Sequence, residues 1–431
     1  MNTWRIQTKQ TNAELYKYER VSFFGKLEDY WADLYGQEYS LYDVRPISAE
    51  ERELIRKSTD RIGHIFFRTA KLLRNVDGDT LMQLGFPEET LRYIKINQLS
   101  SESTIARLDL VKVGNSYKVL EINSDTPTFI KEAFDVNGQI CRMFGMDDPN
   151  EKDSESLWKA TRNAIFQSYE TLGHFEANTP PTVVYTAHKE HVEDFNTVAY
   201  IQNGTKIPAR FIPLDRLQIL KGKGLYDEEG NRIDVLYRQT FPIEMAVRNQ
   251  DKLTGDKIGQ WLLELVEMKK LAMINPPSAF LLQSKAVQAI IWGLHEENNP
   301  FFTEEEHAWI GEYFLPTYLE PDPFFRTQSP FVKKPSFGRE GDTVEIYGLD
   351  GRLVIADMNK TYKDFLPVYQ QYIDLPTVRF MTENGVQTGC EMVGSFLVDG
   401  KASAMGYRAG GRITDNLSYF LPAGITRNEG S

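Results

Sequence analysis

Two acids and an amide, Asp109, Glu121 and Asn123, lie on two strand-like runs at a spacing that could bind a metal ion. Carboxylate and amide oxygens are the ligands that Mg²⁺ prefers, usually together with the phosphate oxygens of a substrate. Gly-Asn-Ser at residues 114–116 separates the two runs and is typical of a hairpin turn. We therefore expect a β-hairpin over residues 105–123.

The register of this hairpin decides whether the three side chains meet. If Gly-Asn-Ser forms a three-residue loop, Asp109 lies directly across from Glu121. Side chains alternate between the faces of a strand, so Arg107 and Asn123 then share the face of the two acids. Facing carboxylates repel, and a bound divalent cation would remove that cost. The alternative is a solvated hairpin face on which Arg107 neutralises one acid.

A second element with chemical potential is the sequence KKPSFGREG at residues 333–341. Gly338 and Gly341 allow backbone amides to approach a ligand closely. Lys334 and Arg339 add positive charge beside them, and together these features can hold phosphate oxygens. The alternative interpretation is the basic turn of a β-hairpin.

Three further residues are ambiguous when taken alone. Lys285 lies in an apolar helical run, where a lysine either extends to the surface or reaches a phosphate from a helix beside the site. Arg408 precedes paired glycines and is either a turn residue or an anion contact. Glu244, in YRQTFPIEM, is either a structural or a ligand-binding acid.

Composition limits the classes of function. The chain has 431 residues and a net charge of −12, which disfavours nucleic acid and anionic membranes as partners and suits cationic amines. Simple solubility explains the same charge. Two distant cysteines and six unclustered histidines indicate neither a disulfide framework nor a zinc site. No signal peptide or membrane span is apparent, so we expect a cytoplasmic protein.

The pattern of elements changes along the chain. Residues 10–100 have helical periodicity, with a possible capping box at Ser48 and Glu51. Strand–helix–strand alternation after residue 180 predicts a small open α/β sheet. Residues 257–296 have a helical pattern broken by two prolines, and the chain from residue 330 indicates largely antiparallel strands.

As an ordered set, these segments resemble the synthetase domain of the glutathionylspermidine synthase family, whose members are ATP-grasp ligases. The resemblance covers roughly residues 20–425 and follows the family order. The matching segments are RLD, EINSDTPT, YRQTFPIE, LLQSKAVQ, FVKKPSFGREG, VYQQYIDLP and GSFLVDG with AMGYRAGGRIT.

The resemblance implies a mixed α+β and α/β fold with an ATP-grasp core. It implies N-terminal helices and the metal-binding hairpin in residues 1–178, followed by a small open α/β pre-ATP-grasp subdomain in residues 179–250. Residues 251–431 would hold a helical insert and the nucleotide-binding region.

The resemblance also implies a role for each matching position. The metal ligands would be Asp109, Glu121 and Asn123. The ATP-binding residues would be Arg107, Lys285, Lys334, Gly338, Gly341, Gln371, Tyr372 and Ile413. The residues that contact the acid substrate would be Thr126, Thr128 and Glu244. Arg339 and Arg408 would stabilise the transferring phosphoryl group.

The implied activity is ATP-dependent ligation of a carboxylate to an amine through an acyl phosphate, with Mg²⁺ as the metal. The family suggests a thiol peptide such as glutathione as the acid and a polyamine as the amine. This sequence has threonine at positions 126 and 128, where well-studied synthases have serine. Bifunctional members of the family carry an N-terminal cysteine amidase domain, which we do not expect here, so we expect no hydrolysis of the product amide. The alternatives are a catalytically degenerate nucleotide-binding regulator and a metal-dependent hydrolase.

Overall fold

The computed structural model describes residues 4–5, 12–339, 341–415 and 417–426. Its largest sheet has seven strands, and the long strand β20 organises it. One edge of β20 pairs with β21, while its other edge pairs first with β19 and then with β5. The strands are β1 (Trp4–Arg5), β5 (Ile105–Val113), β6 (Ser116–Asn123), β19 (Thr377–Thr382), β20 (Gly385–Val398), β21 (Lys401–Gly410) and β22 (Tyr419–Leu421).

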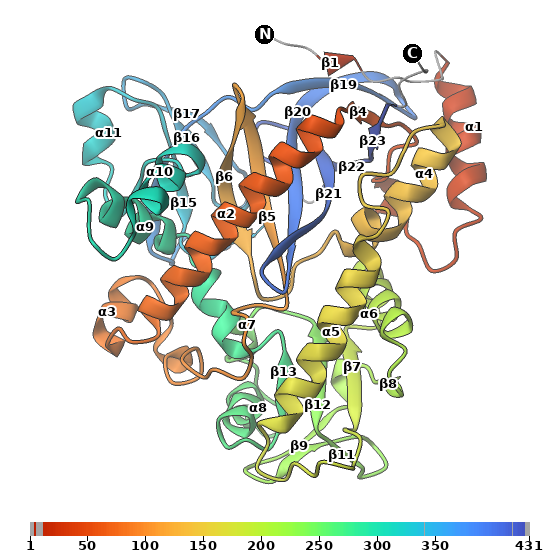
Figure 1. Ribbon diagram of the computed structural model, residues 1–431, viewed down its shortest axis with the longest axis vertical. Helices are drawn as coiled ribbons and strands as arrows, with labels where there is room; N and C mark the ends of the chain where they lie inside the picture. Colours follow the sequence, from red (N-terminus) through yellow and green to blue (C-terminus); the bar gives the residue numbers. More distant parts are fainter. Residues whose placement is uncertain (1–3, 6–11, 340, 416, 427–431) are drawn as a thin grey trace.

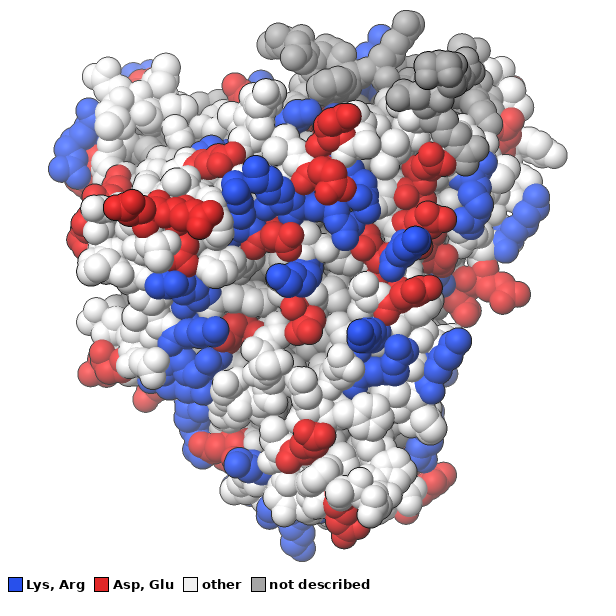
Figure 2. Space-filling view, in the orientation of Figure 1, with Lys and Arg blue, Asp and Glu red and all other residues white. Residues whose placement is uncertain are grey.

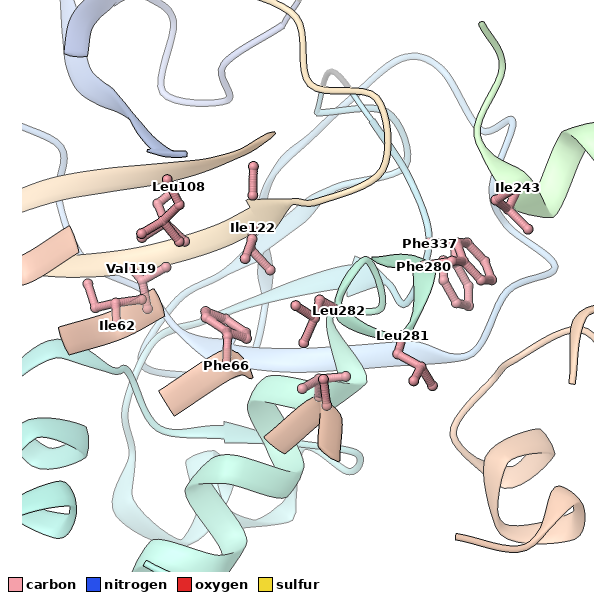
Figure 3. Packing of buried hydrophobic residues seen from close by; sticks show 14 of the residues in the cluster. Ile62, Phe66, Leu108, Val119, Ile122, Ile243, Phe280, Leu281, Leu282 and Phe337 are labelled. Atoms are coloured by element: carbon pink, nitrogen blue, oxygen red, sulfur yellow. The ribbon is translucent and has the colours of Figure 1, made fainter. Parts of the chain in front are cut away.

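The helix α2 (Ala49–Leu73) crosses one face of this sheet (Figure 1). Its buried stripe places Ile62 and Phe66 against Val119 and neighbouring side chains of β5 and β6 (Figure 3). Ser48 caps the helix by accepting from the backbone amide of Glu51. The Glu51 carboxylate instead accepts from the side chains of Lys112 and Tyr117, so only half of the expected capping box forms.

A five-stranded antiparallel sheet lies beside the hairpin, with α9 (Ala286–Glu296), α10 (Glu304–Tyr313) and α11 (Asp322–Thr327) around it (Figure 1). As the sequence indicated, the strands after residue 330 are antiparallel here, and three of them lie between residues 331 and 356. In sheet order the strands are β14 (Thr317–Tyr318), β18 (Pro367–Gln371), β15 (Phe331–Pro335), β16 (Glu345–Tyr347) and β17 (Leu353–Ala356).

The small parallel sheet has four strands, and α5 (Asp153–Glu170), α6 (Val192–Thr205) and α8 (Ile258–Glu267) flank it (Figure 1). Its order is β13 (Ala272–Ile274), β12 (Val235–Gln239), β7 (Val183–Ala187) and β8 (Ala209–Phe211). The central strands are buried throughout, as strands covered on both faces must be. The helical prediction for residues 257–296 was wrong at β13, which is a strand. This strand belongs to the small sheet although it lies beyond residue 250, where the predicted subdomain ends.

Shorter elements complete the fold. They are α1 (Ala13–Phe24), β2 (Asp33–Leu34), β3 (Gln37–Glu38), β4 (Arg45–Ile47), α3 (Gly78–Gln83), α4 (Asn137–Phe144), β9 (Gln218–Leu220), β10 (Gly224–Tyr226), β11 (Arg232–Ile233), α7 (Ile243–Ala246) and β23 (Ala423–Ile425). None of the described helices combines the length and the apolar character that a membrane crossing requires. Acidic and basic side chains are interspersed over the face that α2 crosses, so this face carries no field of a single sign (Figure 2).

Candidate active site

A deep cleft brings together segments that are far apart in the sequence. It lies between the hairpin β5–β6 and the five-stranded sheet, with about 1460 Å³ of space between its walls when its open mouth is counted. The predicted site residues that line it are Arg107, Asp109, Glu121, Asn123, Thr126, Thr128, Lys285, Lys334, Gly338, Arg339, Gly341, Gln371, Tyr372, Arg408 and Ile413.

The hairpin places Asp109 opposite Glu121 and Arg107 opposite Asn123, as the sequence predicted. The route to this register differs from the expected one. Val113 pairs with Ser116, so the turn has two residues rather than three. A β-bulge then follows, in which Leu120 is an extra residue with no partner on β5. The bulge restores the register that the shorter turn would otherwise have shifted by one residue.

Each acid of the hairpin already faces a cation of the protein. Arg107 donates to both carboxylate oxygens of Asp109, at 2.7 Å and 3.1 Å. Lys285 Nζ lies 3.1 Å from Glu121 Oε2. Burial opposes the charged form of Glu121, but Lys285 and then Lys334 outweigh it and hold the pKa of this acid at about 2. Glu121 is therefore ionised at neutral pH and ready to accept another cation.

Lys334 lies on β15 and points into the same cleft, where it donates to Gln370 Oε1 at 2.8 Å. Burial lowers the pKa of Lys334 to about 8, and attraction by Glu121 opposes that shift. A lysine with this pKa is largely protonated at neutral pH but poorly solvated. It therefore has much to gain from an anion that enters the cleft.

The loop after β15 is anchored at its base and held close to the cleft. Phe337 stacks on Phe280 with ring centroids 4.8 Å apart (Figure 3). Lys285 Nζ donates to the Gly338 carbonyl at 3.0 Å. Gly341 has a φ of +70°, and a Cβ there would lie 2.6 Å from the Ile413 side chain, so glycine is required on both grounds. Residue 340, in the middle of the loop, lies outside the described residues.

Polar side chains also gather where the acid substrate was expected. Arg339 Nη2 donates to Thr126 Oγ1 at 2.8 Å. Arg107 Nη1 donates to the Thr128 carbonyl and hydroxyl at 3.1 Å and 3.3 Å. Arg408 reaches the Asp415 carbonyl at 2.6 Å and lines the same cleft. All three guanidinium groups therefore line the cleft, and those of Arg107 and Arg339 contact Thr128 and Thr126, where an anion could bind beside them.

Glu244 is the predicted site residue that does not line the cleft. It lies on α7, is 2% exposed, and has one oxygen, Oε2, that no donor of the described residues reaches. Burial raises the pKa of Glu244 to about 7, against the attraction of Arg339. Nearby, Asp125 pairs with Arg238 and accepts from the Ile243 amide at 3.0 Å. Glu244 thus lies behind Arg339 rather than beside the open space.

The cleft also contains residues that the sequence did not indicate. Leu34, Tyr35 and Tyr39 enter from the N-terminal segment, and Glu193 enters from α6. Only tertiary packing brings these segments to the hairpin, so no local pattern could have identified them. Arg412, also in the cleft, was detectable because it lies next to Ile413 in the segment GGRIT.

The donor set of the cleft fits a hard cation bound together with phosphate. Within residues 4–5, 12–339, 341–415 and 417–426, no three His, Cys, Asp or Glu side chains gather as a complete metal site. The hairpin offers two carboxylates and one amide oxygen, from Asp109, Glu121 and Asn123. This donor set matches a cation that takes its remaining ligands from phosphates and water. Lys334 and Arg339 face the same space and could neutralise those phosphates.

Comparison with known proteins gives the context for this geometry. A Haemophilus influenzae (strain Rd) protein, provisionally named an acid–amine ligase, is 25% identical over 407 residues, covering 91% of this chain and 90% of its own length. A solved glutathione synthetase-like effector from Globodera pallida superposes with a TM-score of 0.60 at 12% identity and covers 98% of this chain and 100% of its own, so the two share a fold of the ATP-grasp type. The profile of the glutathionylspermidine synthase preATP-grasp family matches residues 6–426. The protein therefore belongs to this family.

Proposed function

We propose that the protein is an ATP-dependent ligase that joins a small-molecule carboxylate to an amine and releases ADP and phosphate. The observation that carries the proposal is the meeting of Glu121 and Lys334 in one cleft, although they lie on different sheets. Membership of the ligase family supports the same reaction class. The residue assignments below come from the family motifs and from the contacts in the cleft.

ATP would bind with its triphosphate between the hairpin and the loop 336–342. Lys285, Lys334 and Arg107 would contact its phosphates, because these cations surround the hairpin acids. Mg²⁺ held by Asp109, Glu121 and Asn123 would neutralise charge on the triphosphate during transfer. The base would lie between the strand end at Gln371–Tyr372 and the side chain of Ile413. The amides of Gln371 and Tyr372 already donate to Pro316 and Pro330, so base recognition would use other groups there.

The acid would bind beside Thr126 and Thr128, which Arg339 and Arg107 contact, in the cleft that Arg408 also lines. One carboxylate oxygen would attack the γ-phosphorus, the bond to the β–γ bridging oxygen would break, and ADP would leave with that electron pair. The product is an acyl phosphate, whose charge Arg339 and Arg408 would stabilise. The amine nitrogen would then attack the acyl carbon, phosphate would leave, and the amine would lose a proton.

We propose three regions of the chain on the same grounds. Residues 1–178 would carry the N-terminal helices and the hairpin, residues 179–250 most of the pre-ATP-grasp subdomain, and residues 251–431 the nucleotide region. Because β13 joins the small sheet, the boundary of that subdomain should extend to include Ile274.

The test is ADP release from the purified full-length chain with pools of acids and amines, followed by mass spectrometry of the products. The expected result is ADP formation that requires both an acid and an amine, with an amide product of the summed mass minus water. Stabilisation by Mg-ATP in a thermal melt without turnover on any pool would instead favour a nucleotide-binding regulator. Hydrolysis of an amide without ATP would favour a metal-dependent hydrolase.

A further inference from the structure

Two buried glutamines connect the nucleotide side of the cleft to the hairpin. Gln370 on β18 is 2% exposed and Gln288 on α9 is 3% exposed. Lys334 Nζ donates to Gln370 Oε1 at 2.8 Å, and Gln370 Nε2 donates to Gln288 Oε1 at 3.1 Å. Gln288 Nε2 then donates to the Leu120 carbonyl at 3.1 Å. A continuous chain of hydrogen bonds therefore runs from Lys334 to Leu120.

The two ends of this chain fix its direction. A lysine ammonium can only donate, so Gln370 must turn its carbonyl oxygen toward Lys334. Its amide nitrogen then faces Gln288, which must accept with its own oxygen. The amide nitrogen of Gln288 is left for Leu120, whose backbone carbonyl can only accept. Both amide orientations are thus determined, and the aligned bonds reinforce one another in a buried site.

The Leu120 end of the hydrogen-bond chain lies at the bulge, where the ladder between β5 and β6 is interrupted. Leu120 is the extra residue of the bulge, and β6 pairs with β5 as its one strand neighbour among the described strands. Bulged residues are left out of the ladder, so their conformation depends on contacts outside it. Gln288 supplies such a contact. Glu121, the next residue, takes its direction into the cleft from the conformation of the bulge.

We propose that Gln288 and Gln370 are positioning residues, which hold the Leu120 bulge so that Glu121 is aimed at the cation of the reaction. They also connect the bulge to Lys334 through hydrogen bonds. The orientation of Glu121 on the metal side of the cleft therefore depends on the position of Lys334 on the nucleotide side. This inference rests on the proposed function and extends it to two residues that do not reach the metal themselves. Partners of metal ligands often contribute in this way, and their loss commonly costs about 10–100-fold in metal affinity.

The first test replaces Gln288 with methionine, which keeps the length of the side chain but removes its donor and its acceptor. The measurement is the thermal stabilisation of the full chain by ADP and by a non-hydrolysable ATP analogue, titrated with free Mg²⁺. Gln288→Met should raise the half-saturating Mg²⁺ concentration about tenfold or more. In turnover the KM for Mg²⁺ should rise likewise, while kcat at saturating Mg²⁺ stays near that of the wild type.

The matched control is Val287→Ala on the same helix. Val287 is fully buried and belongs to the apolar core, so this variant should lower the melting temperature. It leaves the hydrogen-bond chain intact and should keep the Mg²⁺ dependence of the wild type. A loss of stability alone is therefore separated from a loss of positioning.

The second test is Gln370→Glu. For this variant our proposal and a rival explanation, added negative charge alone, predict changes of opposite sign in Mg²⁺ affinity. The new carboxylate can still accept from Lys334, but it has no donor for Gln288. Gln288 would turn its amide nitrogen toward that carboxylate and present an oxygen to the Leu120 carbonyl, which breaks the chain at the bulge. Added negative charge alone would tighten Mg²⁺ binding, whereas our proposal expects it to weaken several-fold.

The outcomes separate this inference from the proposed function. A wild-type chain that shows no Mg²⁺-dependent stabilisation by either nucleotide would overturn both. A wild-type response combined with unchanged Mg²⁺ half-saturation in Gln288→Met and Gln370→Glu would overturn the positioning role alone. A shift in both variants but not in Val287→Ala would establish it.

Discussion

Lys285 Nζ lies 3.1 Å from Glu121 Oε2 and also donates to the Gly338 carbonyl, so one side chain joins the hairpin to the loop 336–342. Lys285 therefore supplies the positive charge at Glu121 in this structure. A metal ion that bound Glu121 would compete with it, and the released ammonium would be free to contact a phosphate. Lys285 is 8% exposed, so this exchange would occur between buried partners.

We therefore expect Lys285→Met to change metal and nucleotide binding in opposite directions. Mg²⁺ alone should bind several-fold more tightly, because a like charge beside Glu121 is removed. ADP should bind at least about tenfold more weakly, because a phosphate contact is lost. Isothermal titration with each ligand separately measures both effects. Weaker binding of Mg²⁺ alone would contradict a competing role for Lys285.

Asp109→Ala and Asn123→Ala should both lower turnover by more than a hundredfold, yet they should differ in stability. Repulsion between the facing acids, taken alone, would leave the stability of either variant little changed or raised. The structure changes that expectation, because Arg107 pairs with Asp109 through two hydrogen bonds. Removing one partner of a buried ion pair costs about 3–5 kcal/mol.

Urea unfolding and ADP release distinguish these two variants. Asn123→Ala should remain within about 1 kcal/mol of the wild type, since its amide makes one weak contact, to Glu121 at 3.4 Å. Asp109→Asn serves as the control that keeps the shape of the side chain. Equal stability of Asp109→Ala and the wild type would show that the Arg107 pair contributes nothing net.

The nucleotide affinity should depend on pH through Lys334. Its pKa is lowered to about 8, so the free protein loses this charge as the pH rises through that value. kcat/KM for ATP reports the free enzyme and should fall above about pH 8, by up to about tenfold per unit. Lys334→Arg keeps its charge at all these pH values and should show no fall in this range. A flat profile for the wild type would contradict the assignment.

Glu244 should make stability depend on pH in the opposite sense to an acid whose pKa is lowered by an ion pair. Burial raises its pKa from 4.5 to about 7. Between these values the native state retains a proton that the unfolded chain has lost, so the contribution is full below pH 4.5 and is lost as the pH rises through 7. The limiting loss is about 3 kcal/mol. The free energy of unfolding of the wild type minus that of Glu244→Gln should fall by this amount, and parallel curves would contradict it.

The hydroxyl of Thr126 should matter for the acid substrate and not for ATP. It accepts from Arg339 at 2.8 Å in the cleft that Arg107, Arg339 and Arg408 line. Thr126→Val keeps the shape but leaves Arg339 without this partner, so KM for the acid should rise about tenfold. Thr126→Ser retains the hydroxyl and should stay near the wild type. A rise in KM for ATP instead would move Thr126 to the nucleotide end.

The facing of Asp109 and Glu121 was predictable from the sequence, but the reason for it was not. The chain pattern shows a turn and two strands, and a loop of three residues gives the observed register. The actual turn has two residues, and the bulge at Leu120 supplies the missing one. A bulge of this kind depends on contacts such as that from Gln288, which arrive from distant sequence. Local patterns cannot contain this information.

The glycine-bearing loop and the charged residues beside it were also detectable, because glycines next to lysine and arginine can hold phosphate, although a basic hairpin turn has the same residue types. The structure then distinguishes the predicted site residues that line the cleft from the one that does not. Lys334 and Glu121 share the cleft, whereas Glu244 is buried behind Arg339. The strand β13 was missed because three apolar residues before a proline pair resemble the end of a helix. Tyr39 and Glu193 reach the cleft only through packing between segments.

Because of the bulge at Leu120, the direction of Glu121 and Asn123 depends on the number of residues in β6. If the two-residue turn and the bulge at Leu120 are both kept, deleting one residue of β6 before Leu120 would place Glu121 opposite Leu110 instead of Asp109. Glu121 and Asn123 would then turn to the opposite side of the ribbon, into the apolar layer beneath α2. Adding two residues at the turn would preserve their direction. The number of β6 residues between the turn and the bulge is therefore part of the site, as much as the identity of the side chains.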